Sequence, residues 1–184
     1  MHNPEYEQIK AISNRLLYQY NEKTRLHSWE GSPFEWIAGG IKSRTKGKLG
    51  EDMVKAFLEE NGFSVHTSPD SEADLVVEGR RVEVKLSTLW SMEKYRFQQI
   101  RKQNYDILFC LGLSPHSVHA WTTLKSNIVW SDMSHQHGGT AGGSAGKNTW
   151  WIECDPQGSP HQWMRPQNGD LTKVCGELRR IISS

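Results

Sequence analysis

The sequence is poor in cysteine, has no long apolar run and carries almost no net charge. Its three cysteines, Cys110, Cys154 and Cys175, form no Cys-x-x-Cys pair, so we expect reduced thiols in a cytoplasmic protein rather than a disulfide framework. Neither a cleavable signal nor a membrane-spanning apolar segment is present, and we expect neither export nor membrane insertion. A net charge of +1 argues against a histone-like nucleic-acid binder, although an acidic site can offset basic segments in an enzyme.

What remains is the composition of a globular protein. Hydrophobic residues make up 36% and charged residues 23% of the 184 residues, enough for one buried core. We expect a single domain, 1–184, made of an N-terminal helix and loop (1–45), a core (46–125) and a C-terminal extension (126–184). Apolar residues at helical intervals predict the first helix within residues 4–27, whose apolar stripe packs on the core or forms a homodimer interface.

Residues 73–85 are predicted to fold as a β-hairpin that turns at Glu78-Gly79, because glycine accepts positive φ without steric cost. With this turn Val77 faces Arg80 and, counting back, Asp74 faces Glu83. The hairpin therefore has one apolar face, which predicts packing on a core and consists of Ala73, Leu75, Val77, Val82 and Val84.

The polar face of this hairpin carries Asp74, Glu83 and Lys85, since side chains alternate between the faces of a strand. Two like charges on facing positions destabilise a hairpin unless a cation lies between them. Mg²⁺ is usually held by one or two carboxylates, with carbonyl and water oxygens, so these acids and the Val84 carbonyl form a candidate metal site. The alternative is an edge hairpin with a solvated polar face, in which Lys85 only pairs with an acid.

Asp74, followed after eight residues by Glu83-Val84-Lys85, resembles the motif of the PD-(D/E)xK nuclease superfamily, to which many type II restriction endonucleases belong. The resemblance covers residues 46–112 and neither end of the chain. It implies that Asp74 and Glu83 bind Mg²⁺, for which Mn²⁺ can substitute. It also implies that Lys85 positions or activates the attacking water.

A literal Pro69-Asp70 offers a second way to place the motif. The hairpin register puts Asp70 near Ser87, far from Glu83. The register therefore favours Asp74 as the metal ligand, with Asp70 as the alternative.

A helix is predicted at residues 46–61, where apolar residues recur at helical spacing before a stop at Gly62. Glu51 lies at the border of that apolar stripe. The family resemblance implies that a Glu on this helix completes the metal site. The alternative is an ordinary surface Glu, favoured near a helix N-terminus by the helix dipole.

Two segments near this motif could contact nucleic acid. The first is a basic run without acids and contains Lys42, Arg44, Lys46 and Lys48. The second, residues 94–102, is a strand or a short helix and contains Arg96, Gln98, Arg101 and Lys102. Both segments could equally be solvated polar surface.

The remaining pattern predicts an α/β fold. Residues 105–113 form a nearly continuous apolar run typical of a buried central strand, residues 117–124 and 148–154 read as further strands, and residues 170–183 as a helix capped by Asp170. Together with the resemblance, this indicates a restriction-endonuclease-like core, with a central mixed sheet flanked by helices.

A glycine-rich loop at residues 134–147 ends in Gly146-Lys147, as a phosphate-binding loop does. Ala141 replaces the first glycine of that motif and Asn148 replaces its Ser or Thr, so we expect no nucleotide cofactor. Long loops without structure of their own are often functional, and we favour a loop that embraces DNA.

The sequence thus predicts a Mg²⁺-dependent DNA endonuclease of the restriction type. The alternatives are a non-catalytic nucleic-acid-binding subunit of the same fold, and a repair or recombination nuclease acting on branched or damaged DNA.

Overall fold

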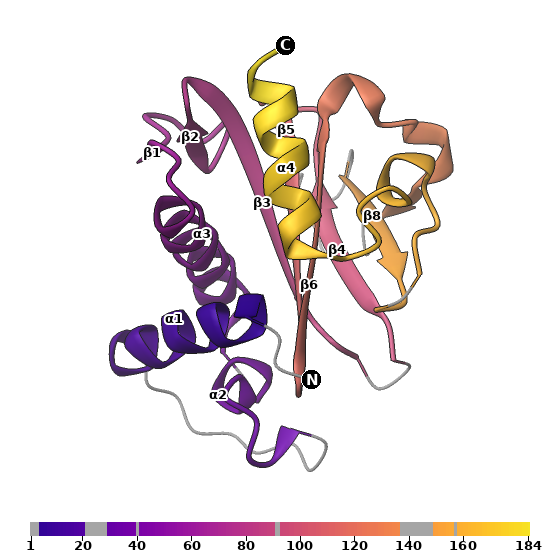
Figure 1. Ribbon diagram of the computed structural model, residues 1–184. Coiled ribbons are helices and arrows are strands. Elements are labelled where there is room, and N and C mark those ends of the chain that lie inside the picture. Colours follow the sequence, from indigo (N-terminus) through magenta and orange to yellow (C-terminus); the bar gives the residue numbers. More distant parts are fainter. Residues whose placement is uncertain (1–3, 21–28, 40, 91–92, 137–148, 157) are drawn as a thin grey trace.

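The computed structural model in Figure 1 describes residues 4–20, 29–39, 41–90, 93–136, 149–156 and 158–184. The helices are α1 (Pro4–Tyr20), α2 (Glu35–Ala38), α3 (Ser43–Glu60) and α4 (Leu171–Ile182), with 3₁₀ helices at Lys125–Asn127, Trp130–Asp132 and Gln162–Met164. The strands are β1 (Val65–Thr67), β2 (Leu75–Val77), β3 (Arg80–Thr88), β4 (Tyr95–Ile100), β5 (Ile107–Ser114), β6 (Ser117–Leu124), β7 (Ser134–Gln136) and β8 (Thr149–Cys154).

The strands form two sheets. The central sheet has five strands in the order β1-β2-β3-β5-β6, and a smaller sheet has the order β4-β8-β7. In the central sheet β3 and β5 run parallel while the other neighbours run antiparallel, so the sheet is mixed. All of β5 is buried, as its continuous apolar run predicts for a central strand.

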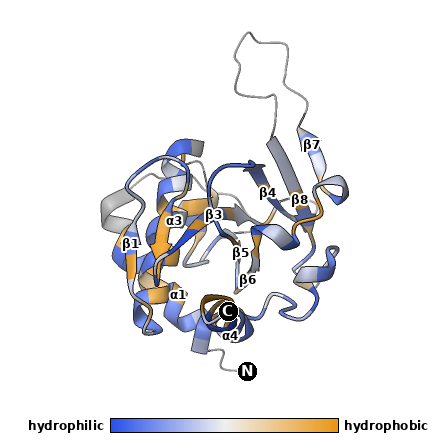
Figure 2. Ribbon diagram, turned by 90° about the horizontal axis from the view of Figure 1, so that it is seen from above, coloured by the Kyte–Doolittle hydropathy of each residue, from blue (hydrophilic) through white to orange (hydrophobic). Residues whose placement is uncertain are grey.

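The central sheet is covered differently on its two faces, as Figure 2 shows from above. Helices α1, α3 and α4 pack on one face, which we call the helical face, around Leu75, Val82 and Phe109. The small sheet covers the other face, around Leu108, Cys110 and Trp121, and we call it the second-sheet face. The predicted mixed sheet with flanking helices is confirmed, and the second sheet is an addition that the sequence pattern did not predict.

The hairpin forms in the predicted register, with Val77 opposite Arg80 and Leu75 opposite Val82. Its turn residues both have positive φ, 48° at Glu78 and 81° at Gly79, which is the backbone of the two-residue turn that matches strand twist. The position of the turn therefore fixes which side chains of β3 reach each face of the sheet.

Several predicted elements differ in detail. Helix α3 begins at Ser43, ahead of the predicted start at residue 46, and residues 94–102 contain a strand, β4. The loop predicted after the first helix, within residues 1–45, contains α2, and Phe34 and Ile37 of this segment are buried in the core. Ala73 does not share the apolar face of Leu75: it packs on the second-sheet face, because β2 begins only after it.

The two ends of the chain pack on the helical face. Ile9 and Ile12 of α1 are fully buried there, so they contact the core of the same chain, and homodimerisation stays a prediction. Helix α4 is capped as predicted, since the Asp170 carboxylate accepts hydrogen bonds from the amides of Thr172 and Lys173. The predicted DNA-embracing loop falls largely on residues 137–148, outside the described residues. None of the helices that the structure describes has the length and apolarity of a bilayer crossing.

Candidate active site

Asp74 lies just before β2, and its side chain is fixed against β3. Strand β2 is short, so the Val84 amide, beyond the last pair of the ladder, is left without a partner in β2. The Asp74 carboxylate takes that place and accepts a hydrogen bond from the Val84 amide at 2.7 Å. The Asp74 amide in turn donates to the Val82 carbonyl at 3.0 Å. These two hydrogen bonds hold the Asp74 carboxylate near Glu83, as the hairpin register predicts.

Glu83 and Lys85 lie on the second-sheet face of β3 and pair with each other. The Lys85 Nζ is 2.6 Å from the Glu83 Oε1, and their side chains are only 17% and 6% exposed. Burial raises the pKa of the Glu83 carboxyl; the Lys85 charge opposes this shift, and the Asp74 charge adds to it. The hairpin thus brings the three predicted residues together. The Lys85–acid pair of the alternative also forms, but the side chains of this pair are mostly buried rather than solvated.

A third carboxylate approaches from helix α3. Burial raises the pKa of Glu51, and the Asp74 charge raises it further, while Lys48 lowers it through a hydrogen bond. The Asp74 charge therefore acts on both Glu51 and Glu83, and we call these three residues the carboxylate cluster. Helix α3 comes this close because Gly50 has no side chain: a Cβ there would lie 2.7 Å from the Cβ of Leu86 in β3.

The donor chemistry of the carboxylate cluster fits a hard divalent ion. Its ligands would be oxygens, and partly buried like charges are relieved by a cation between them. No three His, Cys, Asp or Glu side chains in the described ranges converge closely enough to form a metal centre by themselves. Mg²⁺ usually takes one or two carboxylates and completes its shell with water and substrate phosphate, so Asp74 and Glu83 would suffice as protein ligands.

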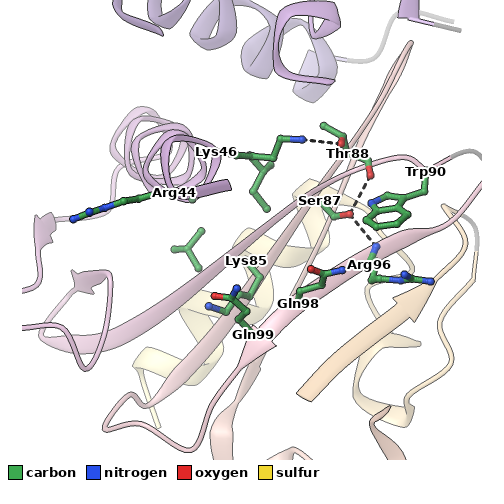
Figure 3. A pocket seen from close by; sticks show the side chains of 12 residues that line it. Arg44, Lys46, Lys85, Ser87, Thr88, Trp90, Arg96, Gln98 and Gln99 are labelled. Atoms are coloured by element: carbon green, nitrogen blue, oxygen red, sulfur yellow. Dashed lines mark hydrogen bonds between the residues drawn. The ribbon is translucent and has the colours of Figure 1, made fainter. Parts of the chain in front are cut away.

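A cavity of about 560 Å³ opens beside this cluster, between the start of α3, the end of β3 and β4, as Figure 3 shows. Val84 and Lys85 line it, and Lys85 connects it to Glu83 of the carboxylate cluster through their ion pair. Its charged lining is entirely basic among the described residues and consists of Arg44, Lys46, Lys85 and Arg96. We call it the basic cavity, and its charge suits a phosphate group.

Two of the predicted phosphate ligands lie in the basic cavity on its α3 side. The Lys46 Nζ donates a hydrogen bond to the Thr88 Oγ1 at 3.3 Å, and burial lowers the pKa of this lysine (Figure 3). Arg44 lines the same wall. Gln98 of β4, which was also predicted to contact nucleic acid, lines the opposite wall.

Other predicted phosphate ligands do not line the basic cavity. Lys48 is engaged by acids, at 3.2 Å from Glu51 and 2.9 Å from Asp52, because all three lie on one side of α3. The Lys102 Nζ lies 5.1 Å from the ring centres of Trp130 and Trp150, in cation–π contact with both.

The remaining two basic residues lie at the edges of this region. Lys42 is exposed at the N-cap of α3, outside the cavity lining. Arg101 lies close enough to Glu83 for its charge to lower the pKa of that carboxyl. Arg101 therefore belongs with the carboxylate cluster rather than with the cavity.

Sequence reasoning missed Ser87, Thr88, Trp90 and Gln99, which also line the basic cavity. Ser87 could have been found, because it follows Lys85 by two residues on the same face of β3. Its hydroxyl accepts a hydrogen bond from the Arg96 amide at 2.9 Å and so ties β3 to β4. Trp90 lies beyond the strand, where no periodicity predicts its place.

Asp70 is not near Ser87, where the extended register placed it. The chain turns away after β1, and Asp70 is an exposed residue whose carboxylate accepts hydrogen bonds from both terminal nitrogens of Arg81. The Arg81 hydrogen bond lowers the pKa of Asp70. Asp74 is therefore the aspartate beside Glu83 and Lys85.

No family model matches this chain, and no curated protein matches its sequence. Among solved structures, the chain is similar to that of a bacterial homing endonuclease, I-Ssp6803I, with 14% sequence identity and a TM-score of 0.44. The match covers 76% of this chain and 99% of that chain. A likeness at this level assigns no activity, so function has to be inferred from the chemistry of the site.

Proposed function

We propose that this protein is a Mg²⁺-dependent DNA endonuclease that hydrolyses phosphodiester bonds and acts as a restriction-type enzyme. The observation that carries the proposal is the Asp74 carboxylate, fixed on the Val84 amide beside the Glu83–Lys85 pair. Lys85 also lines the basic cavity, so an anionic substrate bound there would lie next to the carboxylate cluster.

Asp74 and Glu83 would hold the metal ion, and Glu51 would assist from α3. When bound, Mg²⁺ polarises a phosphate and lowers the pKa of a coordinated water. Lys85 is the only one of the proposed catalytic groups that carries positive charge. Its ammonium donates hydrogen bonds, so it orients the attacking water through the water oxygen and stabilises negative charge that accumulates on the phosphate.

The Glu83–Lys85 pair also explains how the site stays folded without a substrate. A buried carboxylate without a partner is strongly destabilising, and Lys85 supplies the compensating charge. A cation bound to Glu83 would take over that compensation and release the ammonium towards the basic cavity. The same side chain would thus stabilise the resting site and serve the reaction.

The rival function is a nucleic-acid-binding subunit without catalysis. It needs the basic cavity but has no use for a fixed aspartate beside a buried glutamate, because carboxylates repel phosphate. A repair or recombination nuclease on branched or damaged DNA would have the same active site, and only the choice of substrate separates it from a restriction-type enzyme.

The test is cleavage of supercoiled plasmid and of linear DNA by the purified chain, with Mg²⁺ and with EDTA. Cutting should require the metal, and it should be lost in Asp74→Asn, which keeps an oxygen for the Val84 amide. Asp70→Asn is the matched control, because it makes the same change at the exposed aspartate of the literal Pro-Asp motif. Metal-dependent cutting by Asp74→Asn at the wild-type rate would falsify the assignment.

A further inference from the structure

Two consecutive glutamines of β4, Gln98 and Gln99, line the basic cavity together (Figure 3). Neighbouring residues of a regular strand point to opposite faces, so one of the two should point away. The pairing of β4 with β8 is irregular between Phe97 and Ile100, and Gln99 has a φ of 56°. This bulge turns the second amide into the cavity at the cost of a strained backbone, as happens at ligand sites.

Trp90 stands at the rim of the same cavity and is 47% exposed. The Arg96 guanidinium lies 4.5 Å from the centre of its ring and equally 4.5 Å from the ring of Trp151. Arg96 is also held by the Glu153 carboxylate. The Arg96 guanidinium therefore holds one side of the Trp90 ring in place, and the exposed ring surface can stack on another planar ring.

The cavity wall opposite β4 carries two positively charged side chains, Arg44 and Lys46. Arg44 and Lys46 form no ion pair with any residue that the structure describes, and Thr88 is the described hydrogen-bond partner of the Lys46 ammonium. A cation that no carboxylate neutralises attracts phosphate more strongly than a paired one. The basic cavity thus has positive charge on its α3 side, and the Trp90 ring with the Gln98 and Gln99 amides on the other.

We infer that the basic cavity receives one unstacked nucleotide of a DNA strand, next to the bond that is cut. The Lys46 ammonium holds its phosphate, its base stacks on Trp90, and Gln98 and Gln99 hydrogen-bond the base edge, since an amide both donates and accepts. This rests on the Mg²⁺-dependent endonuclease activity of the proposed function, and it moves the substrate from the paired duplex of a restriction-type enzyme to that of the repair or recombination class: DNA with an unpaired or easily unpaired nucleotide. A fully stacked duplex presents no free base face to Trp90.

Binding measured in EDTA tests the inference without cleavage. Fluorescence anisotropy compares three labelled DNA oligonucleotides: a single strand, a duplex with one unpaired nucleotide, and the fully paired duplex. We expect the first two to bind roughly tenfold more tightly than the third. Trp90→Ala should remove this preference and Trp90→Phe should keep it.

Matched variants separate stacking from charge. Trp163→Ala removes a partly exposed tryptophan that does not line the basic cavity and should leave the preference unchanged. Lys46→Gln should weaken binding of all three DNAs alike and reduce the slope of log affinity against log salt by about one. Thermal unfolding of each variant shows whether it is folded.

Equal affinity of the wild type for the three DNAs overturns the inference, as does an undiminished preference in folded Trp90→Ala. Tighter binding of the matching RNA strand overturns the assignment to DNA. These results are independent of the proposed function. A chain that cuts plasmid but shows no preference keeps the nuclease and loses the nucleotide site, whereas one that shows the preference but never cuts loses the nuclease alone.

Discussion

The two faces of strand β3 bury different kinds of side chain, apolar on one face and charged on the other. On the helical face Val82 and Val84 are buried among apolar side chains of the helices and of β5. On the second-sheet face Glu83 and Lys85 are almost as deeply buried, yet both are charged. Burying charge costs free energy unless it is compensated, and this is why we assign the proposed function to the face of β3 that buries a charged pair.

The two faces should therefore respond oppositely to substitution. Changes on the helical face should lower stability, and changes on the second-sheet face should lower activity.

The largest effect is expected at Lys85. Lys85→Ala should reduce the rate of metal-dependent DNA cleavage roughly 10³-fold, because it removes the ammonium that orients water and stabilises charge on phosphate. Single-turnover cleavage measures the rate, and Lys125→Ala serves as a control lysine outside the basic cavity. A loss below about threefold would show that Lys85 only balances the charge of Glu83.

Phe109 of β5 is fully buried on the helical face. Phe109→Ala should lower the free energy of unfolding by about 3 kcal/mol, because it removes apolar contacts and leaves a cavity in the core. Denaturant unfolding gives this value, and cleavage per folded molecule should change little. The contrast between the faces fails if the folded variant loses activity as completely as Lys85→Ala does.

Gly50 allows helix α3 to approach β3 closely on the helical face. Gly50→Ala should lower the free energy of unfolding by about 2 kcal/mol, because its Cβ would meet Leu86 and push α3 from β3. Gly176→Ala is the matched control in α4, where a Cβ meets nothing within 4 Å, and it should stabilise the protein by about 0.5 kcal/mol. Unchanged stability in Gly50→Ala would mean that α3 does not need this close approach.

The smallest effect concerns pH. The pKa values of Glu51 and Glu83 are raised in the folded protein, so folding without metal becomes less favourable as pH rises from their ordinary pKa through the raised one. Mg²⁺ competes with these protons and should reverse the trend. At a few times its dissociation constant it should add about 1 kcal/mol of stability at pH values above the raised pKa, and almost nothing below it.

Thermal unfolding across pH, with and without Mg²⁺, measures this difference. Glu83→Gln should flatten both curves, because the amide does not titrate. A stabilisation by Mg²⁺ that is the same at low and high pH would place its binding away from the carboxylate cluster.

The contrast between the faces also explains what could be predicted from the sequence. The turn at Glu78-Gly79 fixes the register of the hairpin through local backbone chemistry, and that register brought Asp74, Glu83 and Lys85 together as predicted. The central strand β5 and helix α3 follow from apolar periodicity, which is likewise local. Only the ends of such elements shifted, as at Ser43.

What could not be predicted depends on contacts between distant segments. The small sheet pairs β4 with β8, and no local pattern encodes the pairing of Arg96 with Glu153. The bulge that turns Gln99 into the cavity arises from that pairing. Lys48 pairs with Asp52 instead of lining the basic cavity, because that acid lies one helical turn further on, beyond the basic run.

The central claim is that Asp74 and Glu83 bind one divalent ion on the second-sheet face of β3. Electron paramagnetic resonance of Mn²⁺, with the wild type, Asp74→Asn and Asp70→Asn, tests it most directly because free and bound Mn²⁺ give different signals. We expect the wild type and Asp70→Asn to bind Mn²⁺ alike, and Asp74→Asn to bind it at least tenfold more weakly. Equal binding by all three proteins would contradict it.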